Sequence, residues 1–249
     1  MAQPPQPQVA LHPDKGPRGT TMKKLLAGIL NFRKNTAAEY RARFAHLARF
    51  QSPDCLMVAC SDSRVVPNVF ASTEPGDLFV MRNVGNIVPP ADFGPNAAAA
   101  GIDFSLRKLS VRDAVVCGHS HCGAMGAILN YELDSPALAN WLANGLPSRA
   151  RMMKGIFDPH LSPQDQLGQA NVLQQLAHML TYPHVDDAVR SGRLRLHAWW
   201  FDLENAEVLG WSQADGRFLP ITSLEESGLV DPETLRPSRE APATGIGPA

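Results

Sequence analysis

The stretch CLMVACSDSRV, residues 55–65, decides the fold. Its first six residues form a short, continuous apolar run, which is typical of a strand buried on both faces of a sheet. Similar apolar runs occur at 77–81 and 113–119, and 194–212 predicts two further strands around a turn at Glu204 and Asn205. Helical patterns lie between the runs, at 95–109 and over most of 131–192. This alternation predicts an α/β fold, with a mostly parallel central β-sheet flanked by α-helices.

The rest of the chain predicts one large domain with extensions. Its 249 residues are 44% hydrophobic, which is enough for a sizeable core. The net charge of −1 argues against a nucleic-acid partner, and no apolar run reaches the roughly 18 residues that span a bilayer. We expect a disordered tail at 1–21, a single α/β domain at 22–222 that begins with an N-terminal helical arm at 22–49, and a flexible extension at 223–249.

Cysteine and histidine residues mark the predicted functional edge of the sheet. In an open parallel sheet, functional groups gather at the carboxyl ends of the strands. Cys60 ends the first apolar run, and His119 and Cys122 follow the third. If these two strands are neighbours, the three side chains can meet. Two thiolates and an imidazole form a catalytic zinc set with a fourth position open, so we expect one zinc ion per chain in a cytoplasmic protein with reduced thiols.

Neighbouring residues of the same types have simpler interpretations. Cys55 and Cys117 are expected to be small buried hydrophobic residues, as cysteines within strands commonly are. His121 is expected to face solvent from a loop, with a proton-shuttle role as the alternative. Asp62 and Arg64 follow Cys60 at alternate positions. They could be a plain ion pair at the end of a strand or a catalytic pair beside the metal.

Three stretches together resemble the signature of the β-class carbonic anhydrases: CSDSRV at 60–65, RNVGNIV at 82–88 and GHSHCGA at 118–124. The resemblance covers roughly residues 22–220. It implies a zinc lyase that reversibly hydrates carbon dioxide to bicarbonate and a proton. It also implies a homodimer or homotetramer of the plant-type subgroup, with Cys60, His119 and Cys122 as the zinc ligands.

The resemblance also assigns the catalytic and pocket residues. It implies that zinc hydroxide attacks CO2 and that Asp62 accepts the hydroxide's hydrogen. It also implies that Arg64 forms a bidentate pair with Asp62 and keeps the carboxylate ionised. Because CO2 is small and apolar, its pocket should be a dry, apolar slot. By resemblance the slot is lined by Phe79, by Val84 and by Phe104 of a partner subunit, and Gln51 matches a glutamine that hydrogen-bonds the substrate.

A regulatory site of some family members has lost two of its residues here. In those members a non-catalytic bicarbonate, held by a Trp, an Arg and a Tyr, stabilises a closed form in which the aspartate binds zinc. The matching residues are Met57, Arg82 and Phe201. Methionine and phenylalanine have no side-chain donor, so a bound bicarbonate would keep unpaired oxygens. We therefore expect an open site near neutral pH.

Two other functions remain compatible with the sequence. Relatives with the same fold and zinc set hydrolyse COS or CS2, and they differ mainly in how substrate reaches the metal. A non-catalytic zinc-binding protein is the other alternative. The presence of both Asp62 and Arg64 favours an enzyme over that alternative.

Overall fold

The computed structural model describes residues 20–133, 135–155, 158–223 and 227–236. The chain divides between Gln51 and Ser52 into two compact units. The helical segment before the division had been expected to belong to the α/β domain, but by its internal contacts it forms a unit of its own. Each unit is described separately below.

The first unit is helical and contains one π-helical turn near its centre. It consists of α1 (Thr20–Asn31), a π-helical turn η1 (Phe32–Thr36) and α2 (Ala37–Leu47). The interruption falls on FRKNT, where Phe, Asn and Thr are weak helix formers. The side chain of Asn35 also donates to the side chain of Asn31 over 2.7 Å. The helical arm predicted over 22–49 is therefore confirmed as far as Leu47, and the wider π-type turn at its centre is a feature that the sequence did not predict.

The second unit contains a six-stranded sheet in the order β2-β1-β3-β4-β5-β6. The first four strands of this order run parallel, and β5 and β6 run antiparallel to their neighbours. The mostly parallel sheet flanked by helices is thus confirmed, although β6 was not expected. The strands are β1 (Cys55–Cys60), β2 (Leu78–Asn83), β3 (Asp113–His119), β4 (Arg195–Asp202), β5 (Glu207–Ser212) and β6 (Arg217–Pro220).

The helices of the second unit begin at clear sequence signals. Asn96 caps α4 and Ser162 caps α8, each by accepting a backbone N–H with its side chain. The helices are α3 (Pro67–Phe70), α4 (Ala97–Arg107), α5 (Gly123–Asn130), α6 (Pro136–Leu142), α7 (Pro147–Lys154), α8 (Pro163–Met179) and α9 (Pro183–Arg190). The short 3-10 turns are η2 (Ala91–Phe93), η3 (Ala143–Gly145) and η4 (Pro232–Leu235). In the part of the chain that the structure describes, no helix combines the length and the apolar character required to cross a bilayer.

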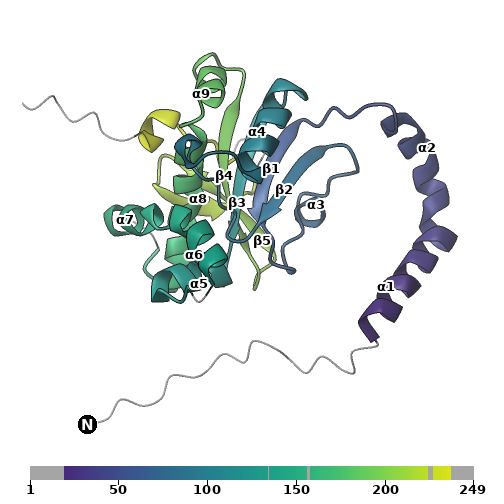
Figure 1. Ribbon diagram of the computed structural model, residues 1–249, viewed down its shortest axis with the longest axis horizontal. Coiled ribbons are helices and arrows are strands. Elements are labelled where there is room, and N and C mark those ends of the chain that lie inside the picture. The colour runs from purple at the N-terminus through teal and green to yellow at the C-terminus, as the bar shows by residue number, and fades with distance from the viewer. Residues whose placement is uncertain (1–19, 134, 156–157, 224–226, 237–249) are drawn as a thin grey trace, which may run out of the picture. The chain divides into compact units, whose positions relative to one another are not determined.

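Helix α8 packs against the sheet, next to β3 (Figure 1). One sheet face packs on α4, α8 and α9, and this cluster includes Val58, Val116, Leu176 and Trp200. Gly118 on β3 allows the close approach, because a Cβ there would lie 2.7 Å from Val172 of α8. The opposite face carries a smaller buried cluster, which includes Met57, Cys117, Val65 and Phe201. The sheet is therefore buried on both sides where its parallel strands end.

The segment after β6 is packed against the sheet. Val230 and Leu235 are buried in the large core cluster, and Leu229 forms a bridge with His197 of β4. Arg236 donates to Asp186 over 2.6 Å. The expectation of a flexible extension from residue 223 is therefore wrong for residues 227–236. Of the disordered tail expected at 1–21, residues 1–19 lie outside the described residues, whereas Thr20 and Thr21 begin α1. The extension from 237 onward also lies outside the described residues.

Candidate active site

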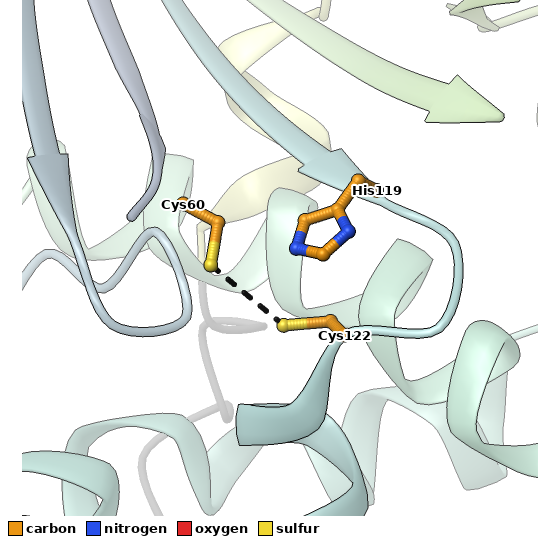
Figure 2. A group of neighbouring side chains, drawn as sticks. All are labelled: Cys60, His119 and Cys122. Atoms are coloured by element: carbon orange, nitrogen blue, oxygen red, sulfur yellow. Dashed lines mark hydrogen bonds between the residues drawn. The ribbon is translucent and has the colours of Figure 1, made fainter. Parts of the chain in front are cut away.

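Three potential metal ligands meet at the carboxyl edge of the sheet. Cys60 ends β1 and His119 ends β3, and these two strands pair in parallel. Cys122 lies three residues beyond His119, as the residue that precedes α5. The ligand atoms of the three side chains lie within 4.8 Å of one another, and all three residues are buried (Figure 2). The expected convergence of two strand ends is confirmed by the pairing of β1 with β3.

The ring of His119 is prepared to bind a cation. Its Nδ1 lies 2.9 Å from the carbonyl oxygen of Ser120 and donates to it. That bond leaves the lone pair on Nε2, which is buried and has no hydrogen-bond partner. A buried ring nitrogen without a partner is costly, and a histidine whose other nitrogen donates to a carbonyl is the usual metal-binding arrangement. With two thiols beside it, His119 completes a donor set that fits zinc.

The two thiols shift each other's pKa in opposite directions. Their sulfur atoms lie 4.0 Å apart (Figure 2). Hydrogen bonding with Cys122 lowers the pKa of Cys60 to about 4, and the N–H of Gly85 adds a contact of 3.4 Å to the Cys60 sulfur. The same hydrogen bond raises the pKa of Cys122, because a second thiolate would face the first. A divalent cation would offset that repulsion and favour both thiolates.

Asp62 and Arg64 form a bidentate ion pair next to the three potential metal ligands. Arg64 donates from Nε to Oδ1 of Asp62 over 2.9 Å and from a terminal nitrogen to Oδ2 over 2.7 Å. The backbone N–H of Arg64 adds a third bond of 3.0 Å to Oδ1. Hydrogen bonding by Arg64 lowers the pKa of Asp62 to about 2. The carboxylate is thus ionised at any working pH and can only accept hydrogen bonds.

A second arginine holds the backbone that carries both Cys60 and Asp62. Arg82 donates from Nε to the Cys60 carbonyl over 3.0 Å and from a terminal nitrogen to the Asp62 carbonyl over 2.6 Å. Sequence reasoning noted Arg82 only as part of a lost bicarbonate site. Its contacts with the carbonyls of Cys60 and Asp62 depend on the pairing of β1 with β2, which no local sequence pattern reveals.

Cys117 and His121 lie where they were expected, whereas Cys55 is less buried than expected. Cys117 is fully buried, Cys55 is half-buried, and burial raises the pKa of each thiol to about 12. Neither belongs to the metal-binding group. His121 is half-exposed, and its Nε2 lies 3.2 Å from Glu204. These positions agree with packing roles for the two cysteines and a loop role for the histidine.

Comparison with known proteins gives the family of the chain. The family model described as carbonic anhydrase matches residues 55–208. A carbonic anhydrase of Pseudomonas aeruginosa is 39% identical over 214 residues, which are 85% of this chain and 97% of that protein. The solved structure of the β-carbonic anhydrase CcaA matches with a TM-score of 0.77 and 34% identity, over 87% of this chain and 98% of that one. The chain belongs to the β-class carbonic anhydrases.

This carbonic anhydrase therefore catalyses the reversible hydration of carbon dioxide to bicarbonate and a proton, with zinc as its cofactor. Tetrameric β-carbonic anhydrases from the ascomycete Sordaria macrospora are also similar, with a TM-score of 0.59 and 26% identity over 82% of this chain and 95% of theirs. The expected family and reaction are confirmed.

The expected pocket residues of this carbonic anhydrase do not all gather at the metal-binding group. Val84 lies in the loop after β2, next to Gly85, and its carbonyl accepts from the ring N–H of Trp141 over 2.8 Å. Phe79 instead stacks on Phe104, with ring centroids 5.9 Å apart. On β2 it pairs with Leu56, four residues before the end of the strand, a separation of about 13 Å along the sheet. Gln51 is exposed at the end of the first unit.

Proposed function

We propose that Cys60, His119 and Cys122 hold the zinc ion of this carbonic anhydrase and that Asp62 and Arg64 are its catalytic pair. The observation that carries the proposal is the buried, unpaired Nε2 of His119, grouped with two sulfur atoms. Zinc bound there would lower the pKa of a coordinated water toward about 7. Asp62 and Arg64 would orient that water for the reaction.

Asp62 orients the reacting water as a fixed hydrogen-bond acceptor. Its Oδ2 lies 4.0 Å from Nε2 of His119, so a water seated in the group can donate one hydrogen to it and direct a lone pair at CO2. Arg64 keeps the carboxylate ionised and holds it away from the ligand atoms. Arg64 is itself held, because it also donates to the carbonyl of His121 over 3.2 Å.

The CO2 pocket is proposed to combine residues of two subunits. Val84 stays in its own subunit, since its loop brings the Gly85 N–H against Cys60. Phe79 and Phe104 form one stacked pair in this chain, and Phe104 is 43% exposed. A pair that lies far from the local ligands and is still exposed is suited to line the slot of a neighbouring subunit. The family resemblance implies instead that Phe104 alone comes from the partner subunit. For Gln51 we keep the proposed contact with substrate.

A homodimer or homotetramer follows from the same reasoning. Helix α1 exposes Leu25, Leu26, Ile29 and Leu30 at 52% or more of their surface. A row of apolar side chains on one helix is a common mark of an interface, and similar family members are described as tetrameric. The thiols of Cys60 and Cys122 must be reduced to bind zinc, which is consistent with the proposed cytoplasmic location.

The ligand assignment is tested by metal content. Purified Cys60→Ser protein should lose most of its zinc and its CO2 hydration activity. Cys117→Ser is the matched control, because that thiol is buried outside the metal-binding group, and it should keep both. Stopped-flow hydration assays, with COS and CS2 tested in parallel, measure activity and substrate range. Zinc content in Cys60→Ser equal to that of the wild type would disprove the ligand set.

A further inference from the structure

A buried carboxylate lies next to the loop that joins the two ligands after β3. Asp165 is only 5% exposed, although it belongs to the first turn of α8. Its Oδ2 accepts from the hydroxyl of Ser162 over 2.8 Å, and its own backbone N–H donates to the same hydroxyl oxygen over 3.1 Å. A helix start needs no buried acid for its own sake, since a serine cap is sufficient. The other carboxylate oxygen has a different partner.

That second oxygen holds the ligand loop. Oδ1 of Asp165 accepts from the backbone N–H of His121 over 2.7 Å, a short bond to a charged acceptor. The preceding residue, Gln164, donates from its side chain to the carbonyl of Cys122 over 2.8 Å. Two consecutive residues of α8 thus contact the two residues that follow Ser120. The loop between His119 and Cys122 is thus bonded to α8, several of whose apolar residues belong to the large core cluster.

The backbone of the loop has a conformation that requires such support. His121 has a φ of 56°, and this left-handed region costs a non-glycine residue on the order of 1 kcal/mol. Ser120 is anchored separately at the end of β4: its N–H donates to the carbonyl of Phe201, and its hydroxyl accepts from the N–H of Leu203, the residue after the strand. The bonds to α8 therefore act on His121 and Cys122 together with two other sets of contacts, from Arg64 to the His121 carbonyl and from the first turn of α5 to the Cys122 carbonyl.

The same loop residue links Asp165 to the catalytic pair. The carbonyl of His121 accepts from Arg64 over 3.2 Å, and Arg64 holds Asp62. Asp165 thus lies at one end of a continuous path that runs through the His121 backbone and Arg64 to Asp62. A shift of this loop would move Cys122 and the catalytic pair together.

We propose that Asp165 is a positioning residue of this carbonic anhydrase, which fixes the His119–Cys122 ligand loop and, through the carbonyl of His121, the Arg64–Asp62 pair. The inference rests on the proposed ligand set and catalytic pair. Gln164 supports the same loop at Cys122.

The test compares Asp165→Ala, Asp165→Asn and the control Asn96→Ala, which removes the cap of α4 and so imposes a similar loss of helix stability. Zinc release to a chromogenic chelator, the visible spectrum of the cobalt-substituted enzyme and kcat are measured for each. Asp165→Ala should release zinc about 10- to 100-fold faster, with a lower kcat and an altered cobalt spectrum. Asp165→Asn should stay close to the wild type, because its amide oxygen can still accept from His121.

Asp165→Ala protein that matches Asn96→Ala in zinc release and cobalt spectrum would overturn the inference. If Asp165→Ala does not fold, Gln164→Ala is measured in the same way, and wild-type behaviour there would count against the anchored loop. Cys60→Ser is included as a comparator. Its retention of zinc would disprove the ligand set itself, whereas its loss of zinc together with an inert Asp165→Ala would disprove only the positioning role.

Discussion

Oδ2 of Asp62 lies 4.0 Å from the unpaired Nε2 of His119, too far for a hydrogen bond. Arg64 instead occupies both oxygens of that carboxylate. The structure therefore presents an ionised acceptor next to the ligand group but outside it. This separation is what an open site requires, because a carboxylate that joined the metal would displace the reacting water.

The first prediction concerns the catalytic pair. Asp62→Asn should retain zinc but lose about 10- to 100-fold in kcat, because an amide can donate to the water as readily as it accepts. Arg64→Ala should lower kcat by removing the grip that holds Asp62 away from the ligands. Arg64→Lys should have a kcat between those of the wild type and Arg64→Ala, since an ammonium group cannot form the bidentate pair with both carboxylate oxygens. Stopped-flow CO2 hydration near that of the wild type in Asp62→Asn and Arg64→Ala would refute these roles.

The second prediction concerns regulation by bicarbonate. Met57 and Phe201 are buried, Phe201 stacks on Phe70 with centroids 4.7 Å apart, and Arg82 is bonded to two backbone carbonyls. These contacts support the expected loss of the regulatory site. Activity should therefore rise with pH as a single ionisation, and its dependence on bicarbonate should show no cooperativity. Initial rates between pH 6 and 9, an interval of about three units around the pKa that zinc gives to water, check this; a steep, multi-proton profile would contradict it.

The third prediction concerns assembly. Ile29→Glu should disrupt the oligomer, because it places a charge among the exposed apolar residues of α1. Activity should fall with it, since the proposed slot needs Phe79 and Phe104 of a neighbour. Lys24→Glu introduces the same side chain at an exposed, already charged position of the helix and is the control. Light scattering at the assay concentration measures the assembly, and a fully active monomer would rule out the shared pocket.

The fourth prediction concerns stability and pH. Asp113 accepts from His197 over 2.8 Å and from Arg195 over 2.8 and 2.7 Å. Burial alone would raise the pKa of Asp113, but the hydrogen bonds from Arg195 and His197 outweigh it and lower the pKa. A carboxylate with a lowered pKa contributes stability above its unfolded pKa of about 3.9, and that contribution is lost as the pH falls through the folded pKa.

Asp113→Asn should accordingly lower the free energy of unfolding by about 1–3 kcal/mol at neutral pH, and the difference from the wild type should shrink below about pH 4. Chemical denaturation at a series of pH values measures it. Asp103→Asn is the control, because its pair with Arg107 is more than half exposed and should contribute less than about 1 kcal/mol. A difference for Asp113→Asn that persists unchanged in acid would contradict the linkage.

Local sequence determined the elements that carry the site. The apolar runs that form β1 and β3 end at Cys60 and His119 as predicted, and the cap of α8 is a serine that lies three residues before its partner Asp165. Such signals depend on residues a few positions apart, so they are present in the chain before it folds. The three family stretches added the ligand types and the Asp62–Arg64 pair.

Tertiary structure alone decided which of these residues meet. The pairing of β1 with β3 brings Cys60 to His119, and the stacking of Phe79 on Phe104 separates that pair from the local ligands. The contacts of Arg82 with the Cys60 backbone and of Asp165 with His121 join residues 22 and 44 positions apart. Contacts over such separations arise from strand order and helix packing, which depend on the whole core and leave no periodic pattern in the sequence.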